Sequence, residues 1–550
     1  MLLLNIVEDR PTPPQIYNYK VYLTALCISW GACLFGYDSS YIGTTIVLPS
    51  FQTAFGLSKL STHELANVSA NIVSTFQLGA FGGAALGFPL MEKYGRKIAL
   101  IIATAVFIIG AIVQTVATHQ LSYVYSGRFL VGLGVGSITS AAPVFLAEIS
   151  PPAIRGRLVG LYEISYQVGA VVGFFINYGI KQHQNTKAAE SWRIPTALQL
   201  VPAGMLMLGL VFVRETPRFL FKQARDAEAT RNLCILRDLS PDHPYILDEI
   251  ASIRTQISDV TVLHAKEETE GRVAWFKSYW RGIAKYCLAK GIRNRMAIGF
   301  MMMLFQNMVG TNAINYYSPT IFKSIGVSNT SLYTGIFGAL KAAASVVFLG
   351  FLVDRLGRRL PLLVGGITCC ICMFYIGAYI KVAHPASYAS ASLMSSSTQA
   401  GAKAATAAIF IFGMSFAASW NGLAWIICSE IYPLKIRGFC AAYTAMAQWL
   451  WQFVIARSTP YAAASLGYGL FFLFGSFCAC AVVFAYFFIP EIKGLTLEQM
   501  DQVFGYVDFD ANPLLQDRQL SNDEIEKQTN NTKQNDYMLS PSIIAPKIEK

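Results

Sequence analysis

Charge is scarce in this chain. Of its 550 residues only 14% are Asp, Glu, Lys or Arg, whereas 54% are hydrophobic, and the mean hydropathy is +0.43. About 25% of the residues in a soluble globular domain are charged. The few charges also leave runs of about 18 or more residues almost uncharged, which is the length that a bilayer requires. The composition excludes an ordinary soluble protein and predicts a polytopic membrane protein.

Recognisable reactive motifs are absent too. The 11 Cys are scattered, several of them inside apolar runs, and their spacing does not suit a metal site. No nucleophile–base pair, phosphate loop or metal cluster can be identified, so neither an enzyme, a cofactor nor a bound metal is expected. Much of the net charge of +11 lies in connecting segments beside the apolar runs, which does not indicate nucleic-acid binding. No secretory signal is visible in residues 1–20, so the first apolar run is expected to serve as the insertion signal.

Twelve apolar runs predict an all-α membrane protein with twelve transmembrane helices in two six-helix bundles. The predicted domains are a cytosolic N-terminus (1–20), an N-terminal bundle (21–213), a cytosolic linker (214–295), a C-terminal bundle (296–489) and a mostly disordered cytosolic tail (490–550). Within the linker, helix-like periodicity covers 226–238 and 245–257. The runs lie near 21–47, 68–90, 98–118, 121–147, 157–180, 194–213, 296–322, 332–353, 361–382, 404–430, 438–460 and 466–489.

Loop charges and sequons set the expected orientation. The loops after the second, fourth, eighth and tenth runs are rich in Lys and Arg, as is the linker, so we assign these to the cytosol. The opposite loops are less basic without being free of Lys. The sequons at Asn67 and Asn329 fall on the external side, where glycosylation is expected. A multi-pass protein with both termini in the cytosol follows.

Two loop motifs occur once in each half of the chain. Glu92-Lys93-Tyr94-Gly95-Arg96-Lys97 returns as Asp354-Arg355-Leu356-Gly357-Arg358-Arg359, and the segment 148–156 returns as 430–438. Such repeats indicate two halves related by a pseudo-two-fold axis along the membrane normal, with a binding site between them near the midplane. Oppositely charged side chains in these loops predict a cytosolic gate, with a solvated loop surface as the alternative. Its members are Arg96, Glu148, Arg155, Arg358, Glu430 and Arg437.

The seventh apolar run is unusually polar over residues 305–319, which include Gln306, Asn307 and Asn312. Unpaired amides are costly in hydrocarbon, so these side chains are expected to face a wet cavity or the protein interior. Amides both donate and accept hydrogen bonds, which suits a ligand covered in hydroxyl groups. Gly310 and Pro319 in the same run predict a discontinuous helix.

The paired loop motifs, together with Phe35-Gly36-Tyr37-Asp38, Gly127-Arg128-Phe129 and Pro490-Glu491-Ile492-Lys493-Gly494, resemble those of sugar porters of the major facilitator superfamily. Over residues 8–500 the chain is most similar in appearance to the fungal quinate permeases. It departs from the usual pattern at Arg214, which stands where these porters have Pro, and at Ile492, which stands where they have Thr. The resemblance implies a transporter that moves a small molecule across a lipid bilayer.

Asp38 is the lone acid of the first apolar run, and intramembrane acids are usually functional. The resemblance implies that an Asp here couples transport to protons, together with the Arg that matches Arg128. The alternative is a static Asp38–Arg128 pair, or an Asp exposed to water near a helix end.

The resemblance also implies a set of substrate-binding residues. Gln167 matches a glutamine that contacts a sugar hydroxyl, and Trp425 matches a tryptophan that stacks on the sugar ring. Tryptophans in spanning helices otherwise serve in packing or in the interfacial belt. The predicted binding residues are Gln167, Gln306, Asn307, Asn312, Lys341, Asn421, Trp425, Gln448, Trp449 and Gln452.

Lys341 lies inside the eighth apolar run, where a lysine needs an anion, a cavity or the interface. It could receive the carboxylate of an acid substrate such as quinate. It could equally pair with an acid of the protein or reach the interface.

Taken together, these features predict a plasma-membrane carrier that imports quinate or a monosaccharide by alternating access with proton symport. Its partners would be the substrate, a proton and the bilayer, and no nucleic acid. A facilitative hexose or xylose transporter is the alternative, and a non-transporting sugar sensor is a weaker one. The sequence leaves the oligomeric state open.

Overall fold

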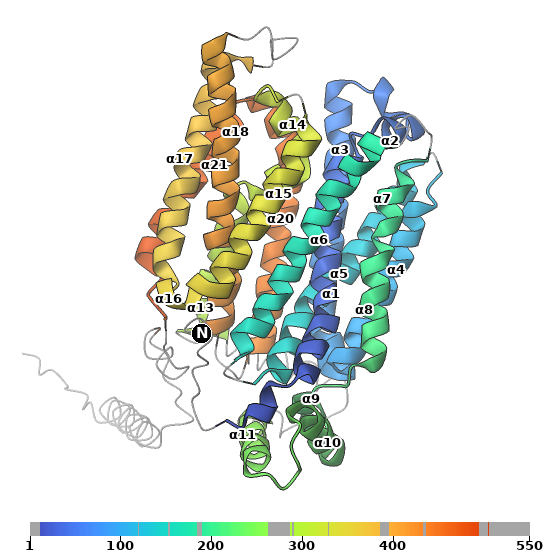
Figure 1. The fold of residues 1–550 in the computed structure, drawn as a ribbon, viewed down its shortest axis with the longest axis vertical. Coiled ribbons are helices and arrows are strands. Elements are labelled where there is room, and N and C mark those ends of the chain that lie inside the picture. The colour runs from blue at the N-terminus through green and yellow to red at the C-terminus, as the bar shows by residue number, and fades with distance from the viewer. Residues whose placement is uncertain are drawn as a thin grey trace, which may run out of the picture.

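The computed structural model describes residues 12–118, 120–151, 154–183, 190–261, 287–288, 291–327, 329–385, 395–432, 436–493 and 504. Within these ranges the chain forms helices and no strand. Figure 1 shows two groups of long helices side by side, with the short helices α9, α10 and α11 at one end of the molecule. Most of the expected tail, 490–550, lies outside the described residues.

The first six spans form the N-terminal bundle. Helix starts follow local sequence: the Asn18 side chain accepts from the backbone N–H groups of Lys20 and Val21 at the start of α1, and Ser61 and Glu64 form a capping box at the start of α3. A short helix, α2 (Pro49–Ala54), lies between them. The spans are α1 (Tyr19–Thr45), α3 (Thr62–Tyr94), α4 (Arg96–Thr115), α5 (Leu121–Ile149), α6 (Arg155–His183), and α7 (Arg193–Leu198) continued by α8 (Leu200–Phe212).

The other six spans form the C-terminal bundle, and three of them are interrupted. They are α13 (Ile292–Met308) followed by α14 (Thr311–Ser324); α15 (Thr330–Val347) continued by the π-helical η5 (Phe348–Leu352) and α16 (Val353–Leu356); α17 (Arg359–Ala383); α18 (Ser396–Phe416) continued by the π-helical η8 (Ala417–Asn421) and α19 (Gly422–Glu430); α20 (Arg437–Leu466); and α21 (Gly469–Phe488).

Eleven of these spans are both long and apolar enough to cross a membrane. The twelfth is α20, a helix of 30 residues that carries Gln448, Gln452 and Arg457 and is therefore more polar. The predicted all-α membrane fold is confirmed.

The seventh span breaks at Gly310, as the sequence predicted. Its φ of +99° is a left-handed conformation that only glycine adopts readily. A second irregularity follows at Tyr317 (φ −122°, ψ 22°), two residues before Pro319. The break frees backbone groups and places the amide side chains of α13 and α14 on either side of a turn.

The linker helices pack beneath the N-terminal bundle. They are α9 (Pro217–Lys222), α10 (Asp226–Arg237) and α11 (Pro244–Thr261), and the last two cover the segments expected to be helical. Arg237 at the end of α10 donates to the Ile149 carbonyl at 2.8 Å and pairs with Glu249 of α11 at 2.6 Å. Asn18 donates to the Leu236 carbonyl at 2.9 Å, which attaches the start of α1 to the same helix.

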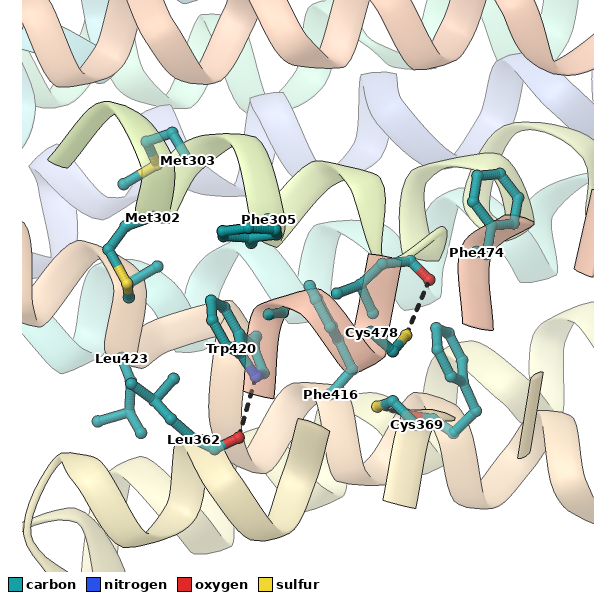
Figure 2. Close-up of a cluster of buried hydrophobic side chains, with 14 of the residues drawn as sticks. Met302, Met303, Phe305, Leu362, Cys369, Phe416, Trp420, Leu423, Phe474 and Cys478 are labelled. Carbon is teal, nitrogen blue, oxygen red and sulfur yellow. Dashed lines mark hydrogen bonds between the residues drawn. The ribbon is translucent and has the colours of Figure 1, made fainter. Parts of the chain in front are cut away.

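Apolar residues lie on both the inside and the outside of the molecule, as a protein dissolved in lipid requires. Phe212, Val382 and Phe487 are each more than 70% exposed on the outer surface. Figure 2 shows the core of the C-terminal bundle, where the buried Trp420 indole donates to the Leu362 carbonyl at 3.1 Å. The indole N–H of Trp420 is therefore satisfied within the apolar core.

The two bundles meet along a surface that we call the inter-bundle seam, formed by α1, α3 and α6 on one side and by α14, α20 and α15 on the other. Each of the first three packs on one of the second three, in that order. The bundles approach closely at Gly43, where an added Cβ would lie 2.0 Å from the Tyr316 carbonyl oxygen. Only glycine at position 43 allows the backbones of α1 and α14 to touch there.

Candidate functional site

Three predicted amide residues of the C-terminal bundle are joined by short hydrogen bonds. Asn307 Nδ2, at the end of α13, donates to Gln448 Oε1 of α20 at 2.7 Å. Asn312 Nδ2, beyond the helix break, donates to Asn307 Oδ1 at 2.6 Å. The turn at Gly310 thus brings residues five apart in sequence together, which a continuous helix would not do with this geometry.

A second chain of hydrogen bonds crosses the inter-bundle seam. Gln306 Nε2 of α13 donates to the Asn421 carbonyl at 2.8 Å, and Asn421 Nδ2 donates to Glu163 Oε1 of α6 at 2.7 Å. Gln167 Nε2, one turn further along α6, donates to the same oxygen at 3.0 Å. We call Gln167, Gln306, Asn307, Asn312, Asn421 and Gln448, with Glu163, the amide cluster.

Two buried side-chain oxygens in and beside the amide cluster lack a hydrogen-bond donor among the described residues. Gln306 Oε1 and Gln452 Oε1 have no hydrogen-bond partner within the described part of the chain, although the Gln452 amide nitrogen donates to Tyr316 Oη at 2.6 Å. Buried polar atoms are normally satisfied. Hydroxyl groups of a bound molecule would satisfy these two oxygens.

The two predicted tryptophans occupy different surroundings. Trp425, of α19, is partly buried and contacts the cores of both bundles. Trp449, of α20, is 1% exposed, donates to Thr139 Oγ1 at 3.2 Å and packs against Phe35 and Phe76. Trp449 is therefore enclosed by the N-terminal bundle, whereas Trp425 keeps accessible ring surface near the amide cluster.

Lys341 is a buried cation with few partners. Its side chain is in α15, at the inter-bundle seam, and the residue is 2% exposed. Its Nζ donates to Asn315 Oδ1 over a long 3.4 Å and lies 6.0 Å from the centre of the Tyr166 ring of α6. No described carboxylate lies within ion-pair distance of it. An ammonium group has three N–H donors, so this one has capacity for a further acceptor.

Asp38 and Arg128 form a fully buried ion pair between α1 and α5. Arg128 Nη1 contacts both carboxylate oxygens at 2.8 and 2.9 Å, and neither side chain is exposed. The guanidinium also donates to the Ile72 carbonyl at 3.3 Å and lies over the Phe76 ring. Each charge is compensated in this conformation, and removing either partner would leave the other buried and unpaired.

The predicted gate residues form one ion pair in each bundle. Arg96 Nη2 lies 2.9 Å from Glu148 Oε1, joining α4 to α5, and Arg358 Nη2 lies 3.0 Å from Glu430 Oε1, joining α17 to α19. Both pairs link helices of the same bundle. The side chains of Arg155 and Arg437 lie outside the described residues.

Two glutamates that the sequence did not single out cap the same loops. Glu215 accepts from the backbone N–H groups of Arg96 and Lys97 at 3.2 and 3.0 Å, and Glu491 accepts from those of Arg358 and Arg359 at 2.9 and 3.0 Å. The repeat thus extends to the segments after the sixth and twelfth spans. Carboxylates at helix N-termini satisfy unpaired N–H groups and interact favourably with the helix dipole.

The two caps differ in their electrostatics. Burial raises the pKa of Glu215 despite its hydrogen bonds. Burial also tends to raise the pKa of Glu491, but donors from the backbones of Arg358, Arg359, Lys493 and Ile492 outweigh it and hold that pKa below its ordinary value. An acid with a lowered pKa stabilises the fold above its unfolded pKa, and one with a raised pKa does so only below it.

Glu491→Gln is therefore expected to lower the melting temperature of the detergent-solubilised protein at neutral pH by about 1–3 °C. The difference should shrink as the pH falls below about 4.3, the ordinary value for Glu, because the wild-type carboxylate is then protonated too. Thermal unfolding of both proteins over a pH series measures it.

Glu215→Gln is the matched control for that measurement, because it removes a charge at the equivalent cap. It should lose less stability than Glu491→Gln at neutral pH, since its ionised form is already disfavoured by burial. Equal losses with the same pH dependence would contradict this difference between the caps.

The two sequons differ in local structure. Asn67 lies in α3, where its Oδ1 accepts from Tyr461 Oη of α20 at 2.6 Å and from Arg457 at 3.4 Å across the inter-bundle seam. Asn329 caps the start of α15, with its side chain accepting from the Leu332 N–H. Glycosylation of either residue remains a prediction.

Sequence reasoning did not predict a role for Glu163, which accepts from Asn421 across the inter-bundle seam. Asn315, which contacts Lys341, and Tyr316, which contacts Gln452, lie in the polar stretch 305–319, but no individual role was predicted for them. A signal for Glu163 existed: it is an acid within an apolar run and lies four residues before Gln167, on the same face of the helix.

Comparisons with known proteins agree with this architecture. Residues 24–504 match the family model described as sugar (and other) transporter. The chain is 43% identical over 509 residues to the probable quinate permease of Aspergillus niger, covering 92% of this chain and 91% of that one. It is 42% identical over 509 residues to the probable quinate permease of Aspergillus flavus, covering 92% of each chain.

Solved structures of similar fold include those of a xylose transporter. The proton:xylose symporter XylE bound to 6-bromo-6-deoxy-D-glucose superimposes with a TM-score of 0.70 at 25% identity, covering 89% of this chain and 100% of that one. A partially occluded inward-open form of XylE from E. coli gives 0.69 at 24% identity, covering 87% and 100%. From the family match and the identity to curated permeases, the chain belongs to the sugar (and other) transporter family of the major facilitator superfamily, and it is a multi-pass membrane transporter of a small molecule rather than an enzyme.

Proposed function

We propose that this protein imports a small polyhydroxylated ring compound, quinate or a monosaccharide, by alternating access and together with a proton. The observation that carries the proposal is the amide cluster at the inter-bundle seam. Its side chains come from both bundles and are joined by hydrogen bonds. A ring with several hydroxyl groups can exchange its hydrogen bonds with water for bonds to such amides.

Within this site the predicted residues serve different purposes: most bind hydroxyl groups, and the two tryptophans shape the site. Gln167, Gln306, Asn307, Asn312, Asn421, Gln448 and Gln452 bind hydroxyl groups, and Trp425 covers one face of the ring. Trp449, enclosed by Phe35 and Phe76, supports the wall behind it. The unpartnered Gln306 Oε1 and Gln452 Oε1 accept from substrate hydroxyls.

Lys341 favours an acid substrate over a neutral one. It is buried, it has spare donors, and it lies on the side of the inter-bundle seam that faces Tyr166. A substrate carboxylate would provide the acceptor that this ammonium group lacks. The probable quinate permeases, at 42–43% identity, support the same choice.

Asp38 carries the coupling proton in this proposal. In the described conformation it is paired with Arg128, and uptake of a proton by Asp38 would break that pair and change the contact between α1 and α5. The likeness to a proton:xylose symporter supports coupling. A second candidate function is a facilitative carrier in which Asp38 and Arg128 are structural. It is favoured by the pair itself, because each buried charge is already compensated by the other.

The carrier is placed in the plasma membrane, with both termini, the linker and the gate residues in the cytosol. Arg96, Glu148, Arg358 and Glu430 hold the cytosolic ends of their helices together, and Arg155 and Arg437 begin the helices that follow, α6 and α20. The bundles then rotate about the bound substrate, opening the site to one side at a time.

Counterflow in proteoliposomes tests the proposal. Vesicles loaded with unlabelled quinate, glucose or xylose should take up the same labelled compound in at least one of the three cases. Gln306→Ala should raise the KM for that compound about tenfold, the loss of roughly one hydrogen bond to a polar ligand. Absence of counterflow for all three compounds would contradict the proposed function.

A further inference from the structure

Glu163 occupies an unusual position for an acid. It lies in the first third of α6 (Arg155–His183), a bilayer-spanning helix, and its Oε1 accepts from Asn421 at 2.7 Å and from Gln167 at 3.0 Å. Both donors are residues that the proposed substrate would need. Glu163 therefore holds two substrate-binding amides through one carboxylate oxygen.

Lys341 lies across the inter-bundle seam from this part of α6. Its Nζ is 6.0 Å from the centre of the ring of Tyr166, which lies three residues beyond Glu163, and no ion pair joins Lys341 to Glu163 within the described residues. Lys341 comes from α15 of the C-terminal bundle and Glu163 from α6 of the N-terminal bundle, and these two helices pack together. Between them they leave the substrate region with zero net charge.

An anionic substrate changes this balance. If its carboxylate joined Lys341 while Glu163 stayed ionised, two negative charges would share one positive charge in a region withdrawn from water, which is costly. A proton on Glu163 restores neutrality. The neutral acid is also a weaker acceptor, which releases the amide groups of Gln167 and Asn421 to the substrate.

We propose that Glu163 takes up a proton whenever a ring compound bearing a carboxylate binds to Lys341, so that an acid substrate travels with one more proton than a neutral one. The inference rests on the proposed function and deepens it. The proton comes from the water on the open side, converts the carboxylate to the carboxylic acid, and returns to water on the opposite side when the substrate leaves.

Few other groups can accept this proton. Asp38 of α1 is paired with Arg128 of α5, and both are fully buried. The remaining titratable side chains around Glu163 on the elements that pack against α6 carry no charge at neutral pH, because they are phenols or thiols. In the described part of the chain they are Tyr162 and Tyr166 on α6 itself, and Cys33 and Tyr37 further along the neighbouring α1.

The experiment compares wild-type protein with Glu163→Gln in proteoliposomes. Proton uptake is followed with a dye trapped inside, and substrate uptake with labelled quinate and labelled xylose. We expect the wild type to move one proton more per quinate than Glu163→Gln does. The number of protons per xylose should be the same in both proteins. Equal proton counts with quinate would overturn the inference.

Glu64→Gln is the matched control, because Glu64 is an acid in the exposed first turn of α3, bonded to Ser61 and far from the amide cluster. It should keep the wild-type proton count with both substrates. A loss there equal to that of Glu163→Gln would overturn the assignment to Glu163.

A binding measurement keeps the inference testable if Glu163→Gln does not fold. With solubilised wild-type protein, the Kd for quinate should rise by about tenfold more per pH unit than the Kd for xylose, in the range where Glu163 must gain its proton on binding. Parallel pH dependence would overturn the inference. Transport of xylose or glucose without any quinate binding would also overturn the inference but would leave the carrier function standing. Movement of none of the three compounds would defeat the proposed function itself.

Discussion

Asp38→Asn is expected to abolish uphill accumulation of substrate while retaining exchange. The amide cannot carry the coupling proton, so the substrate should only equilibrate between the two sides of the membrane. Concentrative uptake driven by an imposed pH gradient, measured beside counterflow in the same proteoliposomes, separates the two activities. Undiminished uphill uptake would refute symport through Asp38 and favour the facilitative carrier.

The matched variant is the double substitution Asp38→Asn and Arg128→Gln. Asp38→Asn alone leaves the Arg128 guanidinium buried without its counter-ion, a change that costs about 3–5 kcal/mol in comparable pairs. The double variant removes both charges and should regain much of that stability without regaining accumulation. A recovery of accumulation in the double variant would show that Asp38 acts only as the partner of Arg128.

Lys341→Met is expected to weaken quinate transport much more than xylose transport. Met keeps the length and apolar stem of lysine but cannot bind a carboxylate. Loss of a charged hydrogen bond is worth about 1.5–3 kcal/mol, or roughly 10- to 100-fold in the KM for the acid. Initial rates of uptake over a range of concentrations of each compound measure the difference.

Lys381→Met is the control for Lys341→Met. Lys381 is an exposed lysine near the end of α17, over the Tyr468 ring, and its replacement removes the same charge away from the inter-bundle seam. It should leave both KM values unchanged. An equal loss of both compounds in Lys341→Met would indicate a structural lysine and would count against an acid substrate.

Much of the fold was predictable because a bilayer imposes strong constraints on sequence. Apolar runs of the required length located the spans, and the repeated loop motifs identified the two bundles. The break at Gly310 was predictable as well, because a glycine among amides in a spanning run is typical of a discontinuous helix. The interruptions at η5 and η8 were not predictable, since neither Gly350 in η5 nor Ser419 and Asn421 in η8 is a specific signal for a π-helical turn.

The candidate site was only partly predictable. Resemblance supplied the amides, which the structure brings together, but the partner of each amide depends on distances between helices that no local pattern encodes. Glu163 illustrates the limit: its contact with Asn421 spans 258 residues of sequence and the two bundles. Trp449, in contrast, was predicted to bind substrate but is buried against Phe35 and Phe76. This burial depends on how α20 packs on the N-terminal bundle, which no local pattern encodes.

The position of the loop ion pairs bears on how the carrier moves. The sequence predicted that the oppositely charged side chains of these loops form a cytosolic gate. Arg96–Glu148 and Arg358–Glu430, however, each join helices of one bundle, and Glu215 and Glu491 attach their loops to that same bundle. Such ties can persist through a rigid-body rotation. Each half would then move as a rigid body. Opening would require separation of the inter-bundle contacts, such as the backbone contact of Gly43 with Tyr316 and the hydrogen bond of Asn421 with Glu163, rather than the breaking of ion pairs.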